Sequence, residues 1–444
     1  MPSQSATPSL RFVDRGPVPL EVDFLGGRLT SDGGLAWLGE ADAALGVTAA
    51  LAAVIPDWRT RRGRHDLTTL VAQRVYQIAC GYDDQDDADA LRTDPLLKHV
   101  CGRLPESGAN LASQPTFSRL ENAIGPRTCY RLAVALGQVY LRERERDGVP
   151  AHLVLDLDGT DDPTHGAQEG TAYHGYFGQY QYFPLLVFDG ETDQLVTAVL
   201  RRGTVHASHG VVAVLTRIVR AVRARWPAVT LEIRADSGFA IPALYAWCEA
   251  EGIGYTIGIA RNDRLAQAVA PLQAEAARQA AAQDGAKVRL LGETRYQADS
   301  WPVARRVIMK AELLPKGPNT RFVVTSRSED PDALYAWYTG RGESENWIKD
   351  LKTGCFADRL SCHRFWANQF RLLLHAAAYW LLDTIRRWLT TTGTDRMTLA
   401  TLRLRLIKIG GWVRERRDRV RLRLASSHPS EPWWRALATR HQPL

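Results

Sequence analysis

Hydrophobic residues recur at helical spacing through the first 125 residues of the chain. The segments SDGGLAWLGEADAALG and DLTTLVAQRVYQIACGY each carry an apolar stripe, which predicts amphipathic helices. Asp66 is placed to cap the second of these helices at its start, and Gly81 is placed to end it. The later segment SQPTFSRLENAIG has Ser113 before Pro115, which is a helix-start signature, and it is a candidate for the second helix of a helix-turn-helix motif. The acidic run GYDDQDDADALRTD predicts a solvated turn whose aspartates cap the next helix.

The pattern changes between residues 151 and 260, where short apolar runs of strand length alternate with amphipathic helices. HLVLDLDG predicts a buried strand, and YFPLLVFDGETDQLVTAVLRRG predicts two more strands joined by a turn at Asp189 and Gly190. A helix, the strand VTLEIRAD, a second helix and the strand IGYTIGIA come next. The predicted order β-β-β-α-β-α-β is the order of a ribonuclease H-like domain.

Residues 262–330 interrupt this alternation. DRLAQAVAPLQAEAARQAAAQ is rich in alanine and predicts a helix, and KVRLLGETRYQAD, PVARRVIMK and TRFVVTS predict three strands. A helical pattern resumes at DPDALYAWY, and residues 365–388 predict a long helix. The segment TLRLRLIKIGGWVRERRDRVRLRLA alternates apolar residues with arginine, which predicts a β-hairpin with one basic face. That face would carry Arg403, Arg405, Arg419, Arg421 and Arg423.

Composition and charge narrow the class of protein. The chain has 444 residues, of which 45% are hydrophobic and 24% are charged, as in ordinary globular proteins. The net charge is +7, and residues 371–444 alone hold 15 basic and 5 acidic residues, a balance of 15 − 5 = +10. A basic end on a near-neutral body favours a polyanion such as nucleic acid as partner, with a solubilising surface as the alternative.

The six cysteines and the hydropathy pattern indicate where the protein works. The cysteines are scattered without any CxxC pair, which predicts reduced thiols in a cytoplasmic protein. The opening segment MPSQSATPSLRFVDRG has no apolar core, so we expect no signal peptide. The most apolar run, LLLHAAAYWLL, is too short to span a bilayer.

Two predicted strands end in aspartate. Asp156 and Asp158 are two residues apart, so they share one face of the first strand, and Asp236 ends the strand VTLEIRAD. The carboxyl ends of parallel strands meet at one edge of a sheet, which would bring Asp158 beside Asp236. Two carboxylates this close repel each other unless a cation lies between them, and hard oxygen ligands suit Mg²⁺. A Ca²⁺ loop is a poor alternative, because Asp161 and Ala167 stand where an EF-hand has glycine and glutamate.

A third carboxylate and three further polar residues lie in YTGRGESENWIKDLKTG. On an ideal α-helix, Tyr338, Arg341, Glu345 and Lys352 fall on one face, and Gly354 would end the helix. The alternative is a solvated face with mixed charges. The two glycines at 340 and 342 also raise the prospect of a break in the helix.

These four residues match the spacing Y-x2-R-x3-E-x6-K without a gap. The chain therefore resembles bacterial insertion-sequence DDE transposases with the Y-R-E-K signature. DLDGTDDPTHG, RADSGF, GYDDQDDADALRTDP and SQPTFSRLEN resemble the insertion sequence 1380-type branch of that group, and the resemblance covers nearly the whole chain. The glycines at 340 and 342 depart from the bulkier residues of many relatives.

The resemblance implies a reaction, in which the transposase cleaves the DNA ends of its insertion sequence by metal-dependent phosphodiester hydrolysis and transfers the 3′-OH ends to target DNA. It also implies a site. Asp158, Asp236 and Glu345 would be the catalytic carboxylates and would bind Mg²⁺, with Mn²⁺ as a substitute. Asp158 is favoured as the first aspartate because it begins the sequence D-G-T, with Asp156 as the alternative. Tyr338, Arg341 and Lys352 would contact the DNA phosphates. The expected partners are double-stranded DNA, as terminal inverted repeats and target, and a second copy of the chain in the synaptic complex.

The expected architecture is α/β. A helical DNA-binding domain at 1–145 would precede a ribonuclease H-like catalytic domain at 146–261 and 331–365. A helix and strands at 262–330 would form a mainly β insertion between Asp236 and Glu345, and 366–444 would form a basic helical and β-hairpin region. The expected location is the bacterial cytoplasm, on the nucleoid when bound to DNA. Two alternatives remain, a ribonuclease H-like nuclease or resolvase and a domesticated DNA-binding protein. A tyrosine recombinase using Tyr338 would leave the acidic residues unexplained.

Overall fold

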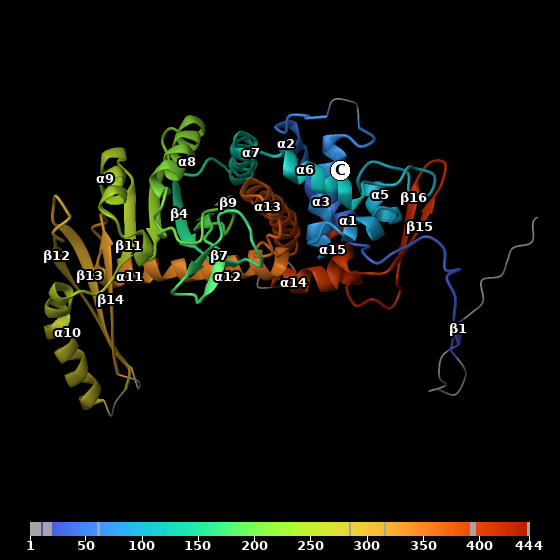
Figure 1. Cartoon of the computed structure of the whole chain (residues 1–444). Helices are drawn as coiled ribbons and strands as arrows, with labels where there is room; N and C mark the ends of the chain where they lie inside the picture. Colours follow the sequence, from blue (N-terminus) through green and yellow to red (C-terminus); the bar gives the residue numbers. More distant parts are fainter. Residues whose placement is uncertain are drawn as a thin grey trace, which may run out of the picture. The chain divides into compact units, whose positions relative to one another are not determined.

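A computed structural model describes residues 10–11, 20–59, 63–146, 148–283, 286–314, 317–390 and 397–441 (Figure 1). The segment 1–16, on which the expectation of no signal peptide depends, lies almost entirely outside these residues. The chain divides into two compact units. Unit 1 contains residues 1–44, 59–119 and 381–444, and unit 2 contains residues 45–58 and 120–380. The domain boundaries expected from the sequence stay predictions.

Unit 1 is mainly helical, as the apolar stripes predict. Asp66 caps the start of one helix by accepting a hydrogen bond from the Thr69 amide, and Gly81 ends that helix with a φ of 98°. The acidic run is not only a turn, because it contains the short helix α4. Asp94 at its end caps the next helix, α5, as predicted, by accepting hydrogen bonds from its first two free amides. The elements of unit 1 are β1 (Leu10–Arg11), β2 (Glu21–Val22), β3 (Leu29–Thr30), α1 (Leu35–Leu45), α3 (Leu67–Cys80), α4 (Asp87–Leu91), α5 (Pro95–Val100), α6 (Gln114–Ala123), α14 (Leu399–Leu402), β15 (Gly411–Glu415), β16 (Val420–Leu424) and α15 (Glu431–His441), with α1 and α6 reaching across the boundary into unit 2.

The C-terminal segment corrects one prediction. The hairpin exists, because β15 and β16 pair antiparallel, but it begins at Gly411. Residues 403–407 form a π-helical turn after α14, so Arg403 and Arg405 do not lie on a strand. In a strand, Leu402, Leu404 and Leu406 would share a face, yet Leu404 is 68% exposed and the other two are fully buried. Helical spacing explains this burial, because it separates position 404 from the buried stripe.

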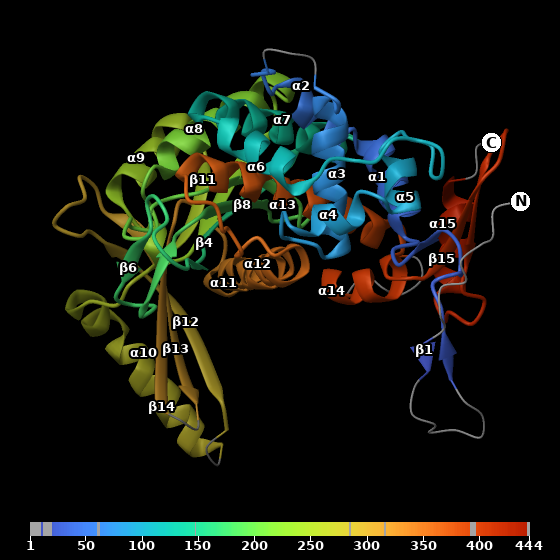
Figure 2. The same ribbon diagram turned by 45° about the vertical axis from the view of Figure 1, so that its right-hand side comes forward.

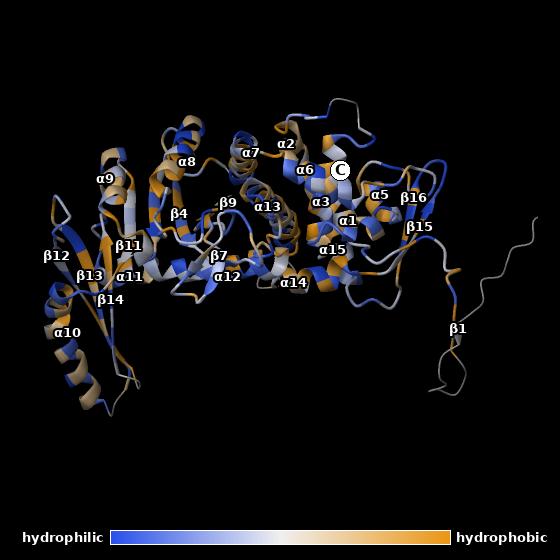
Figure 3. Ribbon diagram, in the orientation of Figure 1, coloured by the Kyte–Doolittle hydropathy of each residue, from blue (hydrophilic) through white to orange (hydrophobic). Residues whose placement is uncertain are grey.

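The remaining arginines of the basic face lie on or beside β16. Arg421 and Arg423 are exposed on this strand, and the ribbon of β16 is coloured mostly hydrophilic in Figure 3. Arg403 instead donates from Nε to the Ala79 carbonyl at 2.8 Å and is buried. The hairpin joins the start of the chain through β3, where Gly411 pairs with Thr30. Unit 1 is therefore built from both ends of the sequence.

Unit 2 has the predicted alternation of strands and helices. Each strand and helix expected between residues 151 and 260 is present, as are the helix and three strands expected after them. The elements are α2 (Val47–Ala53), α7 (Pro126–Arg144), β4 (His152–Gly159), β5 (Asp162–Pro163), β6 (Ala172–His174), β7 (Gln179–Tyr182), β8 (Leu185–Asp189), β9 (Leu195–Val199), α8 (Val211–Arg225), β10 (Thr230–Ala235), α9 (Pro242–Glu251), β11 (Gly254–Ile259), α10 (Asp263–Ala282), β12 (Val288–Tyr296), β13 (Arg305–Leu314), β14 (Gly317–Thr325), α11 (Pro331–Thr339), α12 (Ser344–Lys349) and α13 (Phe365–Trp388), of which α13 continues into unit 1.

An eight-stranded mixed sheet forms the centre of unit 2, in the order β12-β13-β14-β11-β10-β4-β8-β9. Strands β4, β10 and β11 are parallel to one another. Strand β8 pairs antiparallel with β4, and β9 pairs antiparallel with β8 at the edge of the sheet. The strands of the segment expected as an insertion join the same sheet, because β14 pairs antiparallel with β11. Figure 2 shows β12, β13 and β14 extending away from β4, with α10 alongside them.

The helices give one finding about membranes. Among the described residues, no single helix is long and apolar enough to cross a bilayer. Within that part of the chain, only the pair α1 and α2 together has the length and apolar composition of a membrane span, and this pair is bent by 61°. All six cysteines are thiols, as the sequence predicts.

Candidate active site at the ends of β4 and β10

Asp156 and Asp158 lie on the same face of β4 but have different surroundings. Asp156 is fully buried and accepts two hydrogen bonds from Arg234, at 2.7 Å from Nε and 2.6 Å from Nη2. Arg234 stands directly beside it on β10. Both oxygens of Asp156 are therefore held in a buried ion pair, which is a structural arrangement and leaves little freedom to bind a ligand.

Asp158 reaches the carboxyl end of the sheet, where its Oδ2 accepts hydrogen bonds from Arg341 Nη1 and Ser344 Oγ, both at 3.1 Å. Asp236 comes directly after β10 and caps a short 3₁₀ turn by accepting from the Gly238 amide at 2.9 Å. Burial raises the pKa of Asp158 to about 6; the charge of Asp236 adds to this rise and the Arg341 guanidinium opposes it. The two strand ends thus bring two carboxylates close enough to interact, as the parallel arrangement predicts.

The segment with the Y-R-E-K spacing is helical throughout but is not one α-helix. Helix α11 ends at Thr339, a 3₁₀ turn covers Gly340–Glu343, α12 comes next, and a π-helical turn covers Asp350–Gly354. The single α-helical face expected from the sequence is therefore wrong in detail, because the rotation per residue differs in the three types of helix. The helical segment ends at Gly354, as expected, and the positive φ in this region, 57°, belongs to Phe356.

The glycine at 340 has a packing reason. A Cβ added there would lie 2.9 Å from Arg234 Nη1, the guanidinium that holds Asp156. Arg234 Nη1 also donates to the carbonyl of Trp337 at 2.9 Å. The small residue lets the end of α11 approach β10 closely, so glycine at this position accommodates the buried ion pair.

Three of the four signature residues contact the ends of β4 and β10. Tyr338 donates from its hydroxyl to the Ala235 carbonyl at 3.3 Å, and Arg341 contacts Asp158 as described. Lys352 Nζ donates to the backbone carbonyl of Asp161 at 2.8 Å and to its Oδ1 at 2.9 Å. Burial works to raise the pKa of the Asp161 carboxyl, but the Lys352 ammonium outweighs it and the pKa lies below its ordinary value. The segment is therefore fastened to the aspartate-bearing edge of the sheet by polar side chains.

Glu345 is the signature residue that the structure does not bring to the aspartates. It lies exposed in the first turn of α12, next to the buried Ser344 that contacts Asp158. Among the described residues, no group of three or more His, Cys, Asp or Glu side chains is arranged to hold a metal ion. Ser344 and Arg234 are site residues that sequence reasoning missed. Ser344 had one usable signal, its position directly before Glu345.

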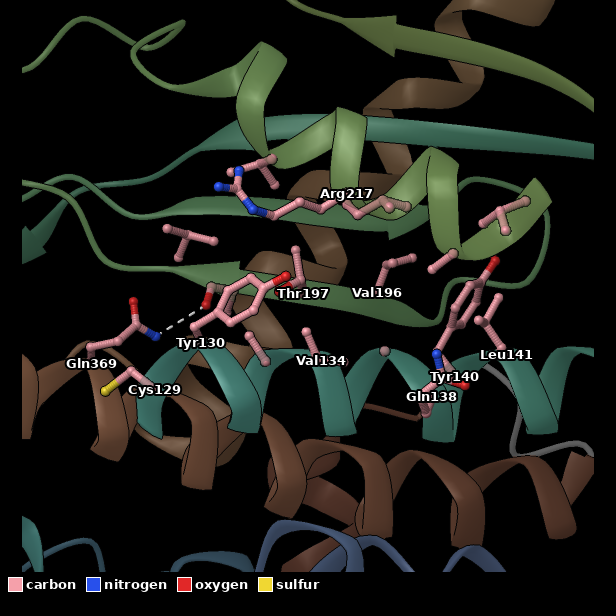
Figure 4. Close-up of a pocket in the computed structure, with 18 of the residues that line it drawn as sticks. Cys129, Tyr130, Val134, Gln138, Tyr140, Leu141, Val196, Thr197, Arg217 and Gln369 are labelled. Carbon is pink, nitrogen blue, oxygen red and sulfur yellow. Dashed lines mark hydrogen bonds between the residues drawn. The ribbon is translucent and has the colours of Figure 1, made fainter. Parts of the chain in front are cut away.

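An apolar pocket of about 280 Å³ lies elsewhere in unit 2, between α7, α8, β9 and α13 (Figure 4). Gln369 on α13 donates to the Ala198 carbonyl at 3.2 Å on its border, and Arg217 extends over the ring of Tyr130. No aspartate or glutamate lines it. The pocket therefore lacks the carboxylates that characterise the edge of the sheet with Asp158 and Asp236.

Comparisons with known proteins found matches that cover most of the chain. A family model described as "Transposase DDE domain group 1" matches residues 15–444. No curated protein matches. Among solved structures, the chain is similar to one described as "Cryo-EM structure of piggyBac transposase synaptic complex with hairpin DNA (SNHP)", with 12% sequence identity and a TM-score of 0.44 over 85% of this chain and 80% of that one.

Proposed function

Because the chain belongs to the family of transposases with a DDE domain of group 1, we propose that it binds the terminal inverted repeats of an insertion sequence. It then cleaves the DNA ends by metal-dependent phosphodiester hydrolysis and transfers the 3′-OH ends to target DNA. We assign it to the branch with the Y-R-E-K signature, the insertion sequence 1380-type, on the unbroken spacing of Tyr338, Arg341, Glu345 and Lys352.

We propose that the core of unit 2 is a ribonuclease H-like catalytic domain. The order β9-β8-β4-β10-β11 within the large sheet supports this. Neighbouring strands are antiparallel from β9 to β4, and β10 and β11 then add in parallel to β4. This order places two consecutive crossover connections, through α8 and α9, between parallel strands. The parallel strand ends then meet at one edge, which is where such sheets build their sites.

In this proposal Asp158, Asp236 and Glu345 hold Mg²⁺, with Mn²⁺ as a substitute. Carboxylate oxygens are the donors that these cations prefer, and the two aspartates already interact at the sheet edge. Glu345 completes the set by turning inward when DNA and cation bind, from a position one residue after Ser344. Bound Mg²⁺ would activate a water or a 3′-hydroxyl and stabilise the leaving oxygen.

Tyr338, Arg341 and Lys352 contact the phosphates of the transposon end in this proposal. All three are hydrogen-bond donors next to the aspartates, and they now donate to protein oxygens. A phosphate oxygen is an equivalent acceptor that carries charge, so DNA would compete for the same donors. Arg341 is the best placed, because its guanidinium is already directed at the carboxylate that would face the scissile phosphate.

One observation carries the proposal. Asp158 and Asp236 come from two neighbouring strand ends, interact with each other, and face an arginine and a serine from the Y-R-E-K segment. The spacing of that segment in sequence and its contact with Asp158 in space are independent facts. Together they favour a cleavage site over a solvated helix face.

The test is cleavage of labelled candidate transposon ends by the purified protein with Mg²⁺. We expect Asp158→Asn, Asp236→Asn and Glu345→Gln to abolish cleavage while end binding stays near that of the unsubstituted chain. Glu343→Gln is the matched control and should cleave normally, because this carboxylate is exposed in the same segment and accepts a hydrogen bond from its neighbour Asn346 at 3.0 Å. Cleavage by Glu345→Gln at the normal rate would remove Glu345 from the site.

The two alternatives differ in the fate of the cut ends. A nuclease or resolvase on the same fold would cut the ends without joining them to a target. A domesticated DNA-binding protein would bind without cutting. Incubation of cut ends with a target plasmid separates all three, since joined product is expected only from a transposase. In the joining reaction we expect a dimer of the chain to hold two ends, which crosslinking of the DNA-bound protein tests.

A further inference from the structure

Two side chains of the Y-R-E-K segment bond the same oxygen of Asp158, and they differ in charge. Arg341 donates from Nη1 and Ser344 donates from Oγ, each at 3.1 Å from Oδ2. No side chain among the described residues donates to the other oxygen, Oδ1. A guanidinium carries a full positive charge, whereas a serine hydroxyl is neutral. The two contacts are therefore alike in distance but unlike in their effect on a cation that approaches this carboxylate.

Ser344 is the more firmly anchored of the two donors. It begins α12 and is fully buried, on one stripe of that helix with two apolar residues. One of them, Trp347, packs its ring against Phe188 of β8, with centroids 5.4 Å apart. The 3₁₀ turn that carries Arg341 has no buried residue. Movement of this turn would release the guanidinium from Asp158, while the packing of α12 would keep the serine hydroxyl in place.

The charges of the two donors have opposite consequences for a cation site. The guanidinium of Arg341 opposes a cation at Asp158, because two positive charges at one carboxylate repel each other. The hydroxyl of Ser344 offers no such opposition, and its hydrogen bond fixes the direction in which the carboxylate points. Side chains that orient a metal ligand in this way typically contribute about 10–100-fold to metal affinity.

We propose that Ser344 is a positioning residue that holds Asp158 ready for a divalent cation, and that Arg341 competes with this cation until DNA draws the guanidinium away. This rests on the proposed function, since it takes Asp158 as a cation ligand. Loss of the serine hydroxyl should therefore weaken cation binding to the DNA-free protein. Loss of the arginine charge should strengthen it, although both side chains bond the same oxygen at the same distance.

The test is the binding of Mn²⁺ to the full chain without DNA, measured from the electron paramagnetic resonance signal of the free ion. In Ser344→Ala, we expect the dissociation constant to rise by about tenfold or more. In Arg341→Met, which keeps a long side chain and removes its charge, we expect the dissociation constant to fall. Thr353→Ala is the matched control and should bind Mn²⁺ normally, because this exposed hydroxyl of the same segment donates to the Lys349 carbonyl at 2.7 Å.

Two further measurements separate positioning from a general loss of structure. Ser344→Thr keeps the hydroxyl and should restore the affinity for Mn²⁺. In cleavage of labelled ends by Ser344→Ala, the Mg²⁺ concentration for half-maximal rate should rise by about tenfold or more, while the rate at saturating Mg²⁺ recovers. A variant that had only lost structure would cleave poorly at every Mg²⁺ concentration.

Several results would overturn the proposal. These are an unchanged Mn²⁺ affinity in Ser344→Ala, a change of the same sign in Ser344→Ala and Arg341→Met, a loss in Thr353→Ala as large as in Ser344→Ala, and no recovery in Ser344→Thr. If the unsubstituted chain binds no Mn²⁺ without DNA, binding by Arg341→Met would support the competition, and its absence would reject the proposal.

Failure of this proposal is distinguishable from failure of the proposed function. Asp158→Asn should remove the Mn²⁺ site, and normal binding by this variant would withdraw Asp158 from the active site. If Asp158→Asn loses Mn²⁺ while Ser344→Ala keeps it, the assignment of the active site stands and only the role of Ser344 is rejected.

Discussion

Replacing Asp156 and Asp158 separately by asparagine should have opposite effects on stability and activity. The two residues are neighbours on one face of β4, and the substitution keeps the shape of each side chain while removing its charge. Asp156 is bound on both oxygens by Arg234, whose side chain is 5% exposed. Burial raises the pKa of both carboxyls, but Asp158 has no such two-bond ion pair and also faces the charge of Asp236. One residue is expected to be needed for folding and the other to be kept for function.

The contacts of the two residues set the expected magnitudes. Asp156→Asn leaves the Arg234 charge buried without a carboxylate, which typically costs about 3–5 kcal/mol of folding free energy. The pKa of Asp158 is raised from 3.8 to about 6. At pH 7 in the absence of divalent cations, such a rise corresponds to about 3 kcal/mol of lost stability, because the folded protein holds the charge less well than the unfolded chain.

The contribution of Asp158 to stability depends on pH. A folded-state pKa above the unfolded value means that the folded protein retains the proton more strongly, so stability is greatest at low pH and falls as pH rises through about 6. Asp158→Asn removes this fall. It also weakens the hydrogen bonds from Arg341 and Ser344, which costs about 1–3 kcal/mol. The net effect at pH 7 is expected to lie between no change and a gain of about 2 kcal/mol.

Scanning calorimetry at pH 7 with a chelator measures the effect. For a unit of this size 1 kcal/mol shifts the melting temperature by about 2–4 °C, so Asp156→Asn should lower it by on the order of 10 °C. Asp158→Asn should leave it unchanged or raise it, yet abolish cleavage. Asp156→Asn should still cleave well below its melting temperature. If Asp158→Asn destabilised unit 2 as much as Asp156→Asn does, the division of roles between them would be refuted.

Four further outcomes are expected. Lys352→Ala should weaken binding to DNA ends and reduce the log–log salt slope by about 0.9, because one phosphate contact is lost, and an unchanged slope would confine this lysine to its contact with Asp161. Mg²⁺ at a hundredfold excess over its dissociation constant should stabilise the unsubstituted chain by about 2.7 kcal/mol but leave Asp236→Asn unaffected in calorimetry. Burial and nearby arginine charges lower the pKa of His65 to about 4, so the stability of unit 1 should fall as pH drops from 6.5 toward 4, and urea unfolding of His65→Gln should show a flatter profile. Arg421→Ala/Arg423→Ala should weaken binding to specific and random duplexes by similar factors in a filter-binding titration, since exposed arginines on β16 would contact the DNA backbone and not the base edges.

The elements of unit 2 were predictable because each has a single pattern of buried and exposed residues. HLVLDLDG has six consecutive buried residues in β4, and α8 carries one apolar stripe, so each pattern has one structural interpretation. The sheet order beyond β11 was not predictable. A local pattern identifies β14 as a strand, but which edge it joins depends on hydrogen bonds to residues about 70 positions away, such as Thr325 with Thr256.

The C-terminal segment shows where periodicity fails. The leucines of TLRLRLI satisfy a period of two, but Leu402 and Leu406 also satisfy helical spacing together with Leu399, which precedes the segment. The packing of Arg403 against α3 decides between the two, because its Nε bonds a carbonyl that lies more than 300 residues earlier. No window along the sequence contains both partners. The glycines at 410 and 411 then separate this helical part from the hairpin.

The candidate site was predictable in its carboxylates and not in their supporting residues. Asp158 and Asp236 are identified by two strand ends and a parallel crossover, which a sequence pattern can reveal. The difference between Asp156 and Asp158 could not be found in this way, because both lie on the same face. It depends on the register between β4 and β10, which sets Arg234 beside Asp156. A one-residue shift would direct this arginine to the other face of the sheet and leave Asp156 without it.

Arg341 connects these observations in the proposed mechanism. Its single positive charge now lies against Asp158, while Asp236 adds a second negative charge nearby. A divalent cation between the aspartates would supply the compensation that this one guanidinium supplies only in part, and Arg341 would then be available to a phosphate. The 3₁₀ turn at residues 340–343 places it at the point where the chain passes from α11 to α12, directly before Ser344 and Glu345. Release of Arg341 from Asp158 and inward movement of Glu345 would therefore be changes in one short segment, so binding of DNA and binding of cation would each favour the other.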